Sequence, residues 1–393
     1  MLSQIVTVTG VNLRSIRERL GSSVVAMVGI AGVVVVFLGV LSIAEGFRAA
    51  MASVGDPQTV IVMRAGSDTE MTSGLSGDTA RLIMDTPGIA RNERGPIASP
   101  ELFVIVGHPT KKDPSDANVP LRGVSSAALA VRPQVKIVEG RMFTEGTNEI
   151  IVGRAASRQF ANLTVGSAPK WGQNRWQVVG IFDANGSAAE SEIWCDARVL
   201  QPAYQRGNSY QSVYARLASA DAFQAFKDAL TTNPQLSVTV VREPDYFAAQ
   251  SDVLNKIIRS IGFLIAGLMG IGAVFGAVNT MYNAVASRTR EIATLRALGF
   301  GSVPVVFSVL SEAVLLSFVG GLFGGLVAWA AFDGYQTSTM NFQSFSQVAF
   351  AFAVTPKLLA TALLYAILMG LFGGLLPAIR AARLPVVTAL REL

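Results

Sequence analysis

The chain has 393 residues, of which 51% are hydrophobic and only 15% are charged, and its formal charge at pH 7 is +5. Soluble globular proteins have about 25% charged residues, so this composition excludes a disordered chain, a collagen-like chain and an ordinary soluble enzyme. The mean hydropathy of +0.44 is too low for a chain that lies wholly in a membrane, and we expect membrane spans joined to a large domain in water.

The first predicted element is a membrane span near the start of the sequence. Residues 24–43 carry no charge, and these 20 residues, at about 1.5 Å each in a helix, cover the roughly 30 Å hydrocarbon core. We place the span at 23–44, after a cytoplasmic amphipathic segment at 1–22. A cleaved signal peptide is the alternative, because Ala50–Ala52 has the small residues of a cleavage site. The apolar run is longer than the hydrophobic region of a signal peptide, which favours a span.

Residues 45–258 form a long stretch of mixed polarity, sufficient for a hydrophobic core of its own. Strand-like and helix-like runs alternate in it, so we predict an α+β domain, and its position after the first span places it outside the cytoplasm. The predicted strands are 59–63, 102–106, 149–152, 177–181, 213–217 and 237–241, and the predicted helices are 75–84 and 221–230.

The two ends of this domain are predicted to continue the membrane helices outward. Val253, Ile257 and Ile261 stand four residues apart among polar residues, which gives a helix at 248–261 one apolar stripe. Together with residues 44–51, this segment is expected to form a stalk. The alternative is that both segments are ordinary surface helices of the domain.

His108 and Cys195 are the only histidine and the only cysteine of the sequence. This excludes an internal disulfide and the zinc motifs that need two histidines. His108 precedes the polar run 111–116, which predicts a solvated side chain, whereas Cys195 beside Trp194 predicts a small buried one. No Gly-x-Ser-x-Gly segment accompanies the serines. We therefore predict no catalytic residues, no metal site and no cofactor in this chain.

Three further spans follow the domain, joined by short segments. We place them at 259–283, 304–331 and 357–377. The segments between and after them are a cytoplasmic loop at 284–303, a short outer loop at 332–356 and a cytoplasmic tail at 378–393.

The cytoplasmic loop contains a short helix pattern. Ile292, Leu295 and Leu298 recur every three residues, Gly299 stands where a helix C-cap is expected, and Pro304 suits the first turn of the third span. The pattern predicts an amphipathic helix at the inner surface. It acts either as a basic connector on anionic lipid or as a lever seated in the groove of a partner.

Arginines set the predicted orientation, because short cytoplasmic segments are enriched in Lys and Arg. Nine arginines in three short segments face only three glutamates, namely Glu18, Glu291 and Glu392. The arginines are Arg14, Arg17, Arg19, Arg288, Arg290, Arg296, Arg380, Arg383 and Arg391. We expect both termini in the cytoplasm, and the basic charge to reflect membrane topology rather than nucleic-acid binding.

Glu312 lies inside the third span, where an acidic side chain costs on the order of 3 kcal/mol. Such a residue usually faces a partner group, and the candidates are Asn279, Tyr282, Ser308 and Ser311. Structural pairing is favoured over a proton relay, because a single carboxyl group is a poor relay.

Glycines stand four residues apart in the later spans, a spacing that lets helix backbones approach closely. We predict helix-packing faces within one subunit or between two. The pairs are Gly272 and Gly276, Gly320 and Gly324, Gly321 and Gly325, and Gly370 and Gly374.

From Arg288 to Gly299 the loop reads Arg-Thr-Arg-Glu-Ile-Ala-Thr-Leu-Arg-Ala-Leu-Gly. It resembles the corresponding segment of the permease family that includes the macrolide exporter MacB, the lipoprotein-release permeases and the cell-division protein FtsX. The resemblance extends over nearly the whole chain, although Pro385 and two valines replace the acidic residue and proline of many members. It includes Asn12–Arg17, Ala44–Gly46, Glu139–Phe143, Asn148–Gly153, Gly373–Ala378 and Arg380–Leu390.

The resemblance implies the permease subunit of an ABC transporter that works by mechanotransmission. The sequence contains no Gly-x-x-x-x-Gly-Lys-[Ser/Thr] segment, so ATP and Mg²⁺ are expected on a separate ATPase subunit. The resemblance implies that the ATPase docks on the loop helix, with Leu13–Leu20 along the inner leaflet. The implied docking residues are Arg288, Arg290, Glu291, Ile292, Leu295, Arg296, Leu298 and Gly299.

The family also implies a location in the bacterial inner membrane and two permease copies, either identical or different, with a periplasmic membrane-fusion adaptor as a further candidate partner. The work would then be export or extraction of a substrate handled by a MacB-like periplasmic domain. A drug, lipid, lipoprotein, peptide or siderophore would each fit. The alternative is an FtsX-like regulator that signals to a periplasmic cell-wall hydrolase without transport. The large outer domain favours export.

Overall fold

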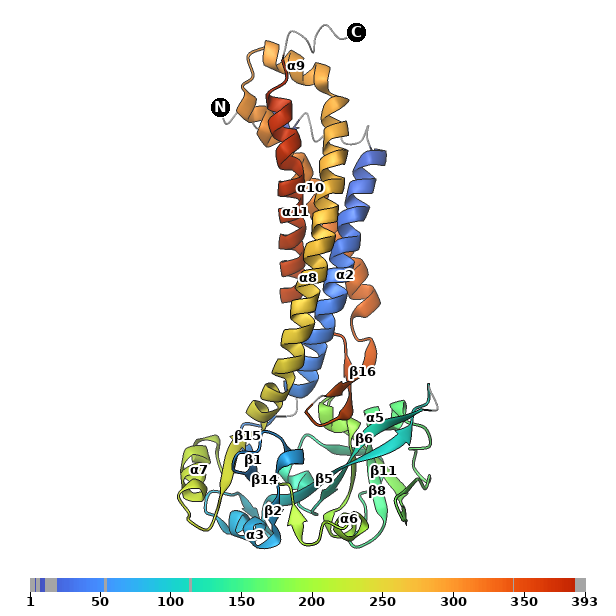
Figure 1. Cartoon of the computed structure of the whole chain (residues 1–393), viewed down its shortest axis with the longest axis vertical. Helices are drawn as coiled ribbons and strands as arrows, with labels where there is room; N and C mark the ends of the chain where they lie inside the picture. The colour runs from blue at the N-terminus through green and yellow to red at the C-terminus, as the bar shows by residue number, and fades with distance from the viewer. Residues whose placement is uncertain are drawn as a thin grey trace. The chain divides into compact units, whose positions relative to one another are not determined.

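The computed structural model describes residues 4, 8–10, 20–52, 55–112, 115–341 and 343–385. They divide into two units, both drawn in Figure 1. One unit, here called the membrane unit, comprises Met1–Glu45, Lys256–Tyr335 and Phe352–Leu393. The other, here called the α/β unit, comprises Gly46–Asn255 and Gln336–Ala351.

Among the residues that the structure describes, four helices are long and apolar enough to cross a membrane. They are α2 (Leu20–Ala52), α8 (Glu243–Ala286), α10 (Ser302–Phe332) and α11 (Pro356–Ala382). The predicted fold class, four membrane helices with a large domain between the first and the second, is confirmed. Helix α8 has 44 residues and is about 66 Å long at 1.5 Å per residue, roughly twice the hydrocarbon thickness. The predicted span at 259–283 occupies only its apolar part.

The first span shows why these segments are helical. Val33–Val36 is a run of four β-branched residues inside α2, and such runs favour strands in water. In lipid, every backbone N–H and C=O must be bonded within the segment, which a helix achieves and an isolated strand does not. The four helices bury a shared apolar core that includes Val34, Phe37, Leu38, Ala266, Ala328, Ala362 and Met369.

The α/β unit is built on a nine-stranded mixed sheet with the order β15-β1-β14-β5-β6-β12-β8-β11-β7. The pairs β6–β12 and β8–β11 are parallel, and the other neighbours are antiparallel. The strands are β1 (Thr59–Arg64), β5 (Ala98–Pro109), β6 (Asp116–Val124), β7 (Lys136–Gly140), β8 (Glu149–Gly153), β11 (Gln177–Asp183), β12 (Ile193–Asp196), β14 (Ser212–Arg216) and β15 (Val238–Arg242).

Short helices cover this sheet. Phe226 and Leu230 of α7 pack with Ile83 of α3 on the strands at the β15 end, and Leu200 of α6 packs on β5 and β6. The helices are η2 (Glu70–Thr72), α3 (Gly77–Asp85), α4 (Ala128–Val131), α5 (Arg154–Gln159), η3 (Ala188–Ser191), α6 (Ala197–Ala203), η4 (Ala220–Ala222) and α7 (Phe223–Thr231). The small pairs are β2 (Leu75–Ser76) with β13 (Ser209–Tyr210), β3 (Arg91–Asn92) with β4 (Gly95–Pro96), and β9 (Lys170–Trp171) with β10 (Asn174–Arg175).

Each of the six predicted strands overlaps a strand of the sheet, and the two predicted helices overlap α3 and α7. The pattern missed β6, β7 and β12. It also missed a hairpin, β16 (Gln336–Asn341) with β17 (Ser346–Ala351), which lies in the predicted outer loop and belongs to the α/β unit. Polar residues fill β16, so it lacks the alternation that identifies a half-buried strand.

The predicted stalk segments lie within the long helices rather than in separate surface helices. Residues 44–51 belong to α2 and residues 248–261 to α8. Arg259 Nη2 lies 3.2 Å from Glu45 Oε2, so an ion pair joins the two helices in the membrane unit. Val253, Ile257 and Ile261 are about half exposed.

The prediction of a solvated His108 is wrong. The side chain is only 8% exposed, and its ring lies beside that of Trp171, whose Nε1 donates to His108 Nδ1 at 3.2 Å. His108 Nε2 therefore carries the proton and donates to the Ala161 carbonyl at 2.7 Å. Cys195 is fully buried, as predicted.

Candidate functional site

The predicted loop helix is present as α9 (Thr289–Ala297). It ends at Leu298, and Gly299 follows in the left-handed region with a φ of +93°. The Gly299 N–H donates to the Arg296 carbonyl and the Phe300 N–H to the Leu295 carbonyl, both at 3.1 Å. These two bonds form a Schellman motif, which explains the glycine that follows the helix.

One face of α9 is buried against three spans, near the end of α8, the start of α10 and the end of α11. Ile292 is 7% exposed and Ala293 1%. Ile292 packs in a cluster with Val285 of α8, Val309 of α10 and Ala381 of α11. A movement of α9 is therefore opposed by contacts with all three helices.

Arg288, just before α9, forms a buried ion pair with Glu312 of α10. Its Nη1 lies 3.1 Å from Glu312 Oε2 and its Nη2 3.4 Å from Oε1. Arg288 is 7% exposed and Glu312 3%. The partner of Glu312 is thus Arg288, which the sequence analysis assigned to the docking surface. Asn279, one of the partners predicted for Glu312, is exposed.

Arg296 bonds to the C-terminal end of α11. Its Nη1 donates to the Ala382 carbonyl at 2.7 Å and to the Leu384 carbonyl at 3.1 Å. Carbonyl groups at a helix end lack partners within the helix, and a guanidinium satisfies them well. Arg296 thus positions the last turn of α11 against α9.

The other face of α9 is exposed. Of the eight predicted docking residues, Arg290, Glu291, Leu298 and Gly299 are exposed, and Leu295 is partly buried. Leu298 has 71% of its surface exposed. A large apolar side chain beside two charges of opposite sign is what a protein partner's groove can bind.

The predicted packing glycines fall into three groups. A Cβ at Gly320 or Gly324 would lie less than 3 Å from backbone of α2, at Met27 and Ala31. Gly321 and Gly325 face α11 instead, and Gly370 and Gly374 face α10. Gly272 and Gly276 face open space in the described chain, so α8 presents an unpacked stripe.

Other predicted residues, Leu13–Arg19 of the N-terminal flank and Arg391 of the tail, lie outside the described residues.

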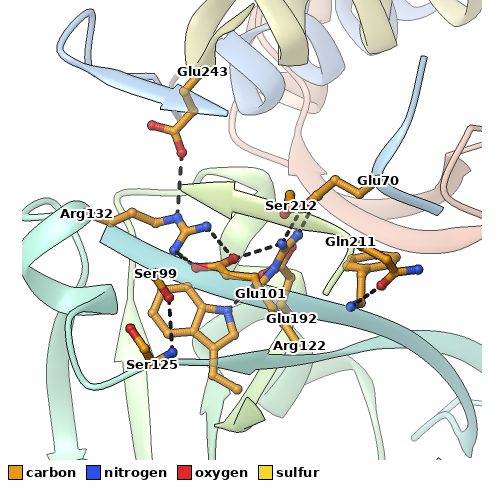
Figure 2. Close-up of polar contacts among 12 residues, drawn as sticks. Glu70, Ser99, Glu101, Arg122, Ser125, Arg132, Glu192, Gln211, Ser212 and Glu243 are labelled. Carbon is orange, nitrogen blue, oxygen red and sulfur yellow. Dashed lines mark hydrogen bonds and ion pairs between the residues drawn. The ribbon is translucent and has the colours of Figure 1, made fainter. Parts of the chain in front are cut away.

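The α/β unit contains a buried charge cluster that the sequence did not predict (Figure 2). At its centre, Arg122 of β6 contacts Glu70 at 2.8 and 3.0 Å, Glu192 at 2.8 Å through two nitrogens, and Glu101 at 3.0 Å. Its guanidinium also lies 4.8 Å from the ring centroid of Phe103. The sequence gives little signal for this cluster, because Arg122 stands at a polar position of the alternating strand β6.

Arg132 is the second cation of this cluster. It contacts Glu101 at 2.7 and 2.8 Å, and its Nε lies 3.6 Å from Glu243 at the start of α8. The guanidinium lies 3.9 Å from the ring centroid of Tyr214. All six charged residues are less than 10% exposed. The cluster therefore joins η2, β5, β6, the end of α4, the start of β12 and the start of α8.

The charge cluster consists of carboxylates and guanidinium groups that pair with one another, so we assign it a structural role. No group of three or more His, Cys, Asp or Glu side chains among the described residues is arranged to hold a metal ion. Helix α9, in contrast, has an exposed side with charged and apolar side chains that a partner can contact.

Comparison with known proteins identifies the family. Residues 23–233, more than half of the chain, match the family model described as the MacB-like periplasmic core domain. Residues 263–386 match the model of the FtsX-like permease C-terminal region. The chain belongs to the MacB/FtsX-like family of ABC transporter permeases. It is a multi-pass membrane protein.

Three curated relatives of this permease illustrate the similarity. The ABC transporter permease YvrN of Bacillus subtilis, whose name calls it uncharacterised, is 24% identical over 96% of both chains. The macrolide export ATP-binding/permease protein MacB of Nitrosomonas europaea is 24% identical over 93% of this chain and 55% of its own. The pyoverdine export ATP-binding/permease protein PvdT of Pseudomonas entomophila is 29% identical over 68% of this chain. The chain thus spans about half or less of the two relatives that include an ATP-binding part, with 38% of PvdT covered.

Two segments of the α/β unit that resemble the family, Glu139–Phe143 and Asn148–Gly153, are joined by hydrogen bonds in the structure of this permease. Arg141, which follows β7, donates through Nη1 to Glu149 Oε2 at 2.7 Å, and the Thr144 N–H donates to the same oxygen at 2.8 Å. These contacts close the loop between β7 and β8. The hydrogen bonds from Arg141 lower the pKa of Glu149 to about 2.

Proposed function

We propose that this chain is the permease subunit of an ABC transporter in which ATP hydrolysis by a separate ATPase subunit moves the α/β unit, driving export or extraction of a substrate. ATP and Mg²⁺ would bind to the ATPase, since the sequence contains no phosphate-binding Gly-x-x-x-x-Gly-Lys-[Ser/Thr] loop. The match over 96% of both chains to YvrN, which is named as an ABC transporter permease, supports the permease role.

The observation that supports this proposal is that α9 has one exposed side and one side that is bonded to other helices. Its exposed side offers Arg290, Glu291 and Leu298 to a partner. Its other side is tied to α10 through Arg288 and Glu312, and to α11 through Arg296. A push on the exposed side would therefore be transmitted to several spans at once.

In this proposal, α8 transmits the movement of α9 toward the α/β unit. Helix α8 runs without interruption from Glu243, whose carboxylate lies in the buried charge cluster, to Ala286, three residues before α9. A continuous helix transmits displacement along its axis. Two permease copies are proposed, because an ABC ATPase acts as a pair and each ATPase subunit needs one α9 helix.

Export is favoured over the regulatory alternative by the match of residues 23–233 to the MacB-like periplasmic core domain. MacB and PvdT are named as export proteins for macrolides and pyoverdine. On this basis the substrate is handled on the periplasmic side of a bacterial inner membrane, with a membrane-fusion adaptor as a candidate partner.

The test is the double variant Arg290→Glu/Leu298→Asp, purified from native membranes. Both side chains are exposed, so the permease should fold, but we expect it to lose co-purification of the ATPase subunit and transport-coupled ATP hydrolysis. Arg383→Glu makes the same charge reversal as Arg290→Glu, at an exposed site beyond α11, and should retain both. Arg296 is unsuitable for this test, because its loss would also disturb the end of α11. If the double variant keeps its ATPase, α9 is not the docking site.

A further inference from the structure

A groove of about 560 Å³ lies wholly within the α/β unit. Its walls come from the β16–β17 hairpin, from the two lysines that follow β5, from α5 and from the turn before η3. Pockets for small molecules typically have volumes of 300–1,000 Å³. The groove is separate from α9 and from the buried charge cluster.

The lining of the groove is positively charged. Lys111, Lys112 and Arg158 face a single carboxylate, Glu190, so the formal balance is +2. Glu190 Oε1 already accepts two backbone N–H groups, from Ala184 at 2.9 Å and Gly186 at 2.7 Å. The carboxylate is therefore held by the turn itself, and the three cations set the field in the groove.

The cations keep donors available for a ligand. Lys111 Nζ donates to the Ser157 carbonyl at 2.8 Å, which uses one of its three protons. Arg158 Nη1 lies 3.3 Å from Gln336 Oε1, which uses one of five. Lys112 and Arg158 are exposed. A guanidinium beside ammonium groups is the usual protein arrangement for binding carboxylate or phosphate.

Two polar atoms of the lining lack partners. The Ser187 hydroxyl is buried, the residue being 2% exposed, and it has no hydrogen-bond partner among the described residues. Gln159 Oε1 is in the same state. Buried polar groups are normally hydrogen-bonded, and each exception needs an explanation. Both atoms are also closed to solvent, so they are not ligand contacts, and recognition of an acid would rest on the cations.

Part of the groove wall is apolar. Ala155 lies on the α5 side, and Ala349 and Phe350 lie on β17. Phe350 is 4% exposed, and its ring packs edge-on against Phe47 with the centroids 5.7 Å apart. The position of the hairpin wall is fixed by the Ala349 N–H, which donates to Ser191 Oγ at 2.9 Å.

We propose that this groove binds a small anionic ligand, a carboxylate or phosphate carried on an apolar body. The cations would bind the acid, and the alanines would contact the apolar body. The volume favours a small molecule over a protein segment, because a specific protein interface buries about 800 Å² on each partner. This inference does not depend on the proposed transport activity.

The experiment compares two probes of the same shape, 2-naphthoate and its neutral amide 2-naphthamide. Binding to the full chain in lipid nanodiscs is measured by saturation-transfer NMR and equilibrium dialysis, with empty nanodiscs as the blank. We expect the acid to bind at least tenfold more tightly than the amide, and its affinity to fall as salt rises from 50 to 300 mM.

Variants then locate the site. Lys112→Gln/Arg158→Gln should weaken 2-naphthoate binding about tenfold or more. Lys170→Gln/Arg175→Gln removes the same charge from the exposed β9–β10 pair, outside the groove, and should leave binding unchanged. The intrinsic tryptophan fluorescence of each variant verifies that the α/β unit is folded.

Three outcomes would overturn the proposal. Equal binding of acid and amide would indicate apolar adsorption without charge recognition. Unchanged affinity in the Lys112→Gln/Arg158→Gln variant would place the site elsewhere. Binding of a polyglutamate peptide with no binding of 2-naphthoate would assign the groove to an acidic protein partner. Because no ATPase is present in the assay, none of these results bears on the docking role of α9.

Discussion

Glu70 is held by three other residues in the interior of the α/β unit. Its carboxylate accepts two bonds from Arg122 and one from the Ser212 hydroxyl at 2.6 Å, and its backbone N–H donates to the Tyr246 hydroxyl at 3.0 Å. Burial acts to raise the pKa of Glu70, but the Arg122 guanidinium and the Ser212 hydroxyl more than offset it. The pKa of Glu70 therefore lies below its usual value of 4.5, and the carboxylate stays ionised.

Because the pKa of Glu70 is lower in the folded than in the unfolded chain, its contribution to stability is present above about pH 4.5 and is lost as the pH falls further. Glu70→Gln should lower the free energy of unfolding at pH 7 by about 3 kcal/mol, since it leaves Arg122 with less compensating charge. It should also flatten the loss of stability between pH 5 and 3.

Tryptophan fluorescence can follow this unfolding, because three of the four tryptophans, Trp171, Trp176 and Trp194, are buried in the α/β unit. The exposed Glu93→Gln should match the wild type at every pH. An unchanged midpoint for Glu70→Gln at pH 7 would contradict the assigned role of the cluster.

At single residues, the sequence predicted helix ends correctly, because their positions depend on the spacing of a few neighbouring residues. Gly299 and Pro304 were placed correctly at the end of α9 and in the first turn of α10, because caps depend on a few neighbouring residues. The partner of Glu312 was not found. Arg288 lies 24 residues away, and the turn between α8 and α9 that directs it inward leaves no periodic pattern. The buried glutamates of the charge cluster were missed for the same reason.

Helix α10 packs on two neighbours through two rows of glycine. The spacing of four predicted close approach of backbones but not which helix would fill each row. Gly320 and Gly324 face α2, whereas Gly321 and Gly325, one residue further around the helix, face α11. Strand prediction shows a similar limit. In β6 the apolar residues Ala117, Val119 and Leu121 alternate with polar ones, but Pro120 within the run argues against a strand, and β6 was missed.

Gly324→Leu and Gly272→Leu should distinguish a glycine that packs against a neighbouring helix from one that faces open space. At position 324 even a Cβ would lie 2.6 Å from the Ala31 carbonyl oxygen, so the helices must move apart. We expect a loss of about 1–3 kcal/mol or more from overpacking, seen as a lower thermal midpoint in detergent. At position 272 a side chain meets open space in the described chain, and the midpoint should stay near that of the wild type. A Gly324→Leu protein as stable as the wild type would refute the close contact between α2 and α10.

At the scale of the whole molecule, the prediction that depends most on charge is the orientation in the membrane. The arginines near α9 and α11 favour the cytoplasm for this end of the helices. Cys195 is fully buried, so the folded wild-type chain should react little with maleimides. A single added cysteine therefore reports its own exposure.

We expect Lys170→Cys, exposed in the α/β unit, to be labelled by a membrane-impermeant maleimide on intact spheroplasts. Arg290→Cys, exposed on α9, should be labelled only after lysis. Gel shift after reaction with a polyethylene-glycol maleimide provides the measurement. The reverse pattern would invert the topology and exclude docking of a cytoplasmic ATPase on α9.

The hairpin of β16 and β17 has a consequence for biosynthesis. The first 210 residues of the α/β unit, Gly46–Asn255, leave the ribosome as one block, but Gln336–Ala351 are made about 80 residues later. At about 5–20 residues per second, this delay and the synthesis of the hairpin itself last roughly 5–20 s. During that interval the Ser191 hydroxyl lacks the Ala349 donor that it has in the finished chain. A nascent permease thus carries an unfinished groove until two more spans have been translated, and chaperones or proteases on the same side of the membrane would meet it in that form.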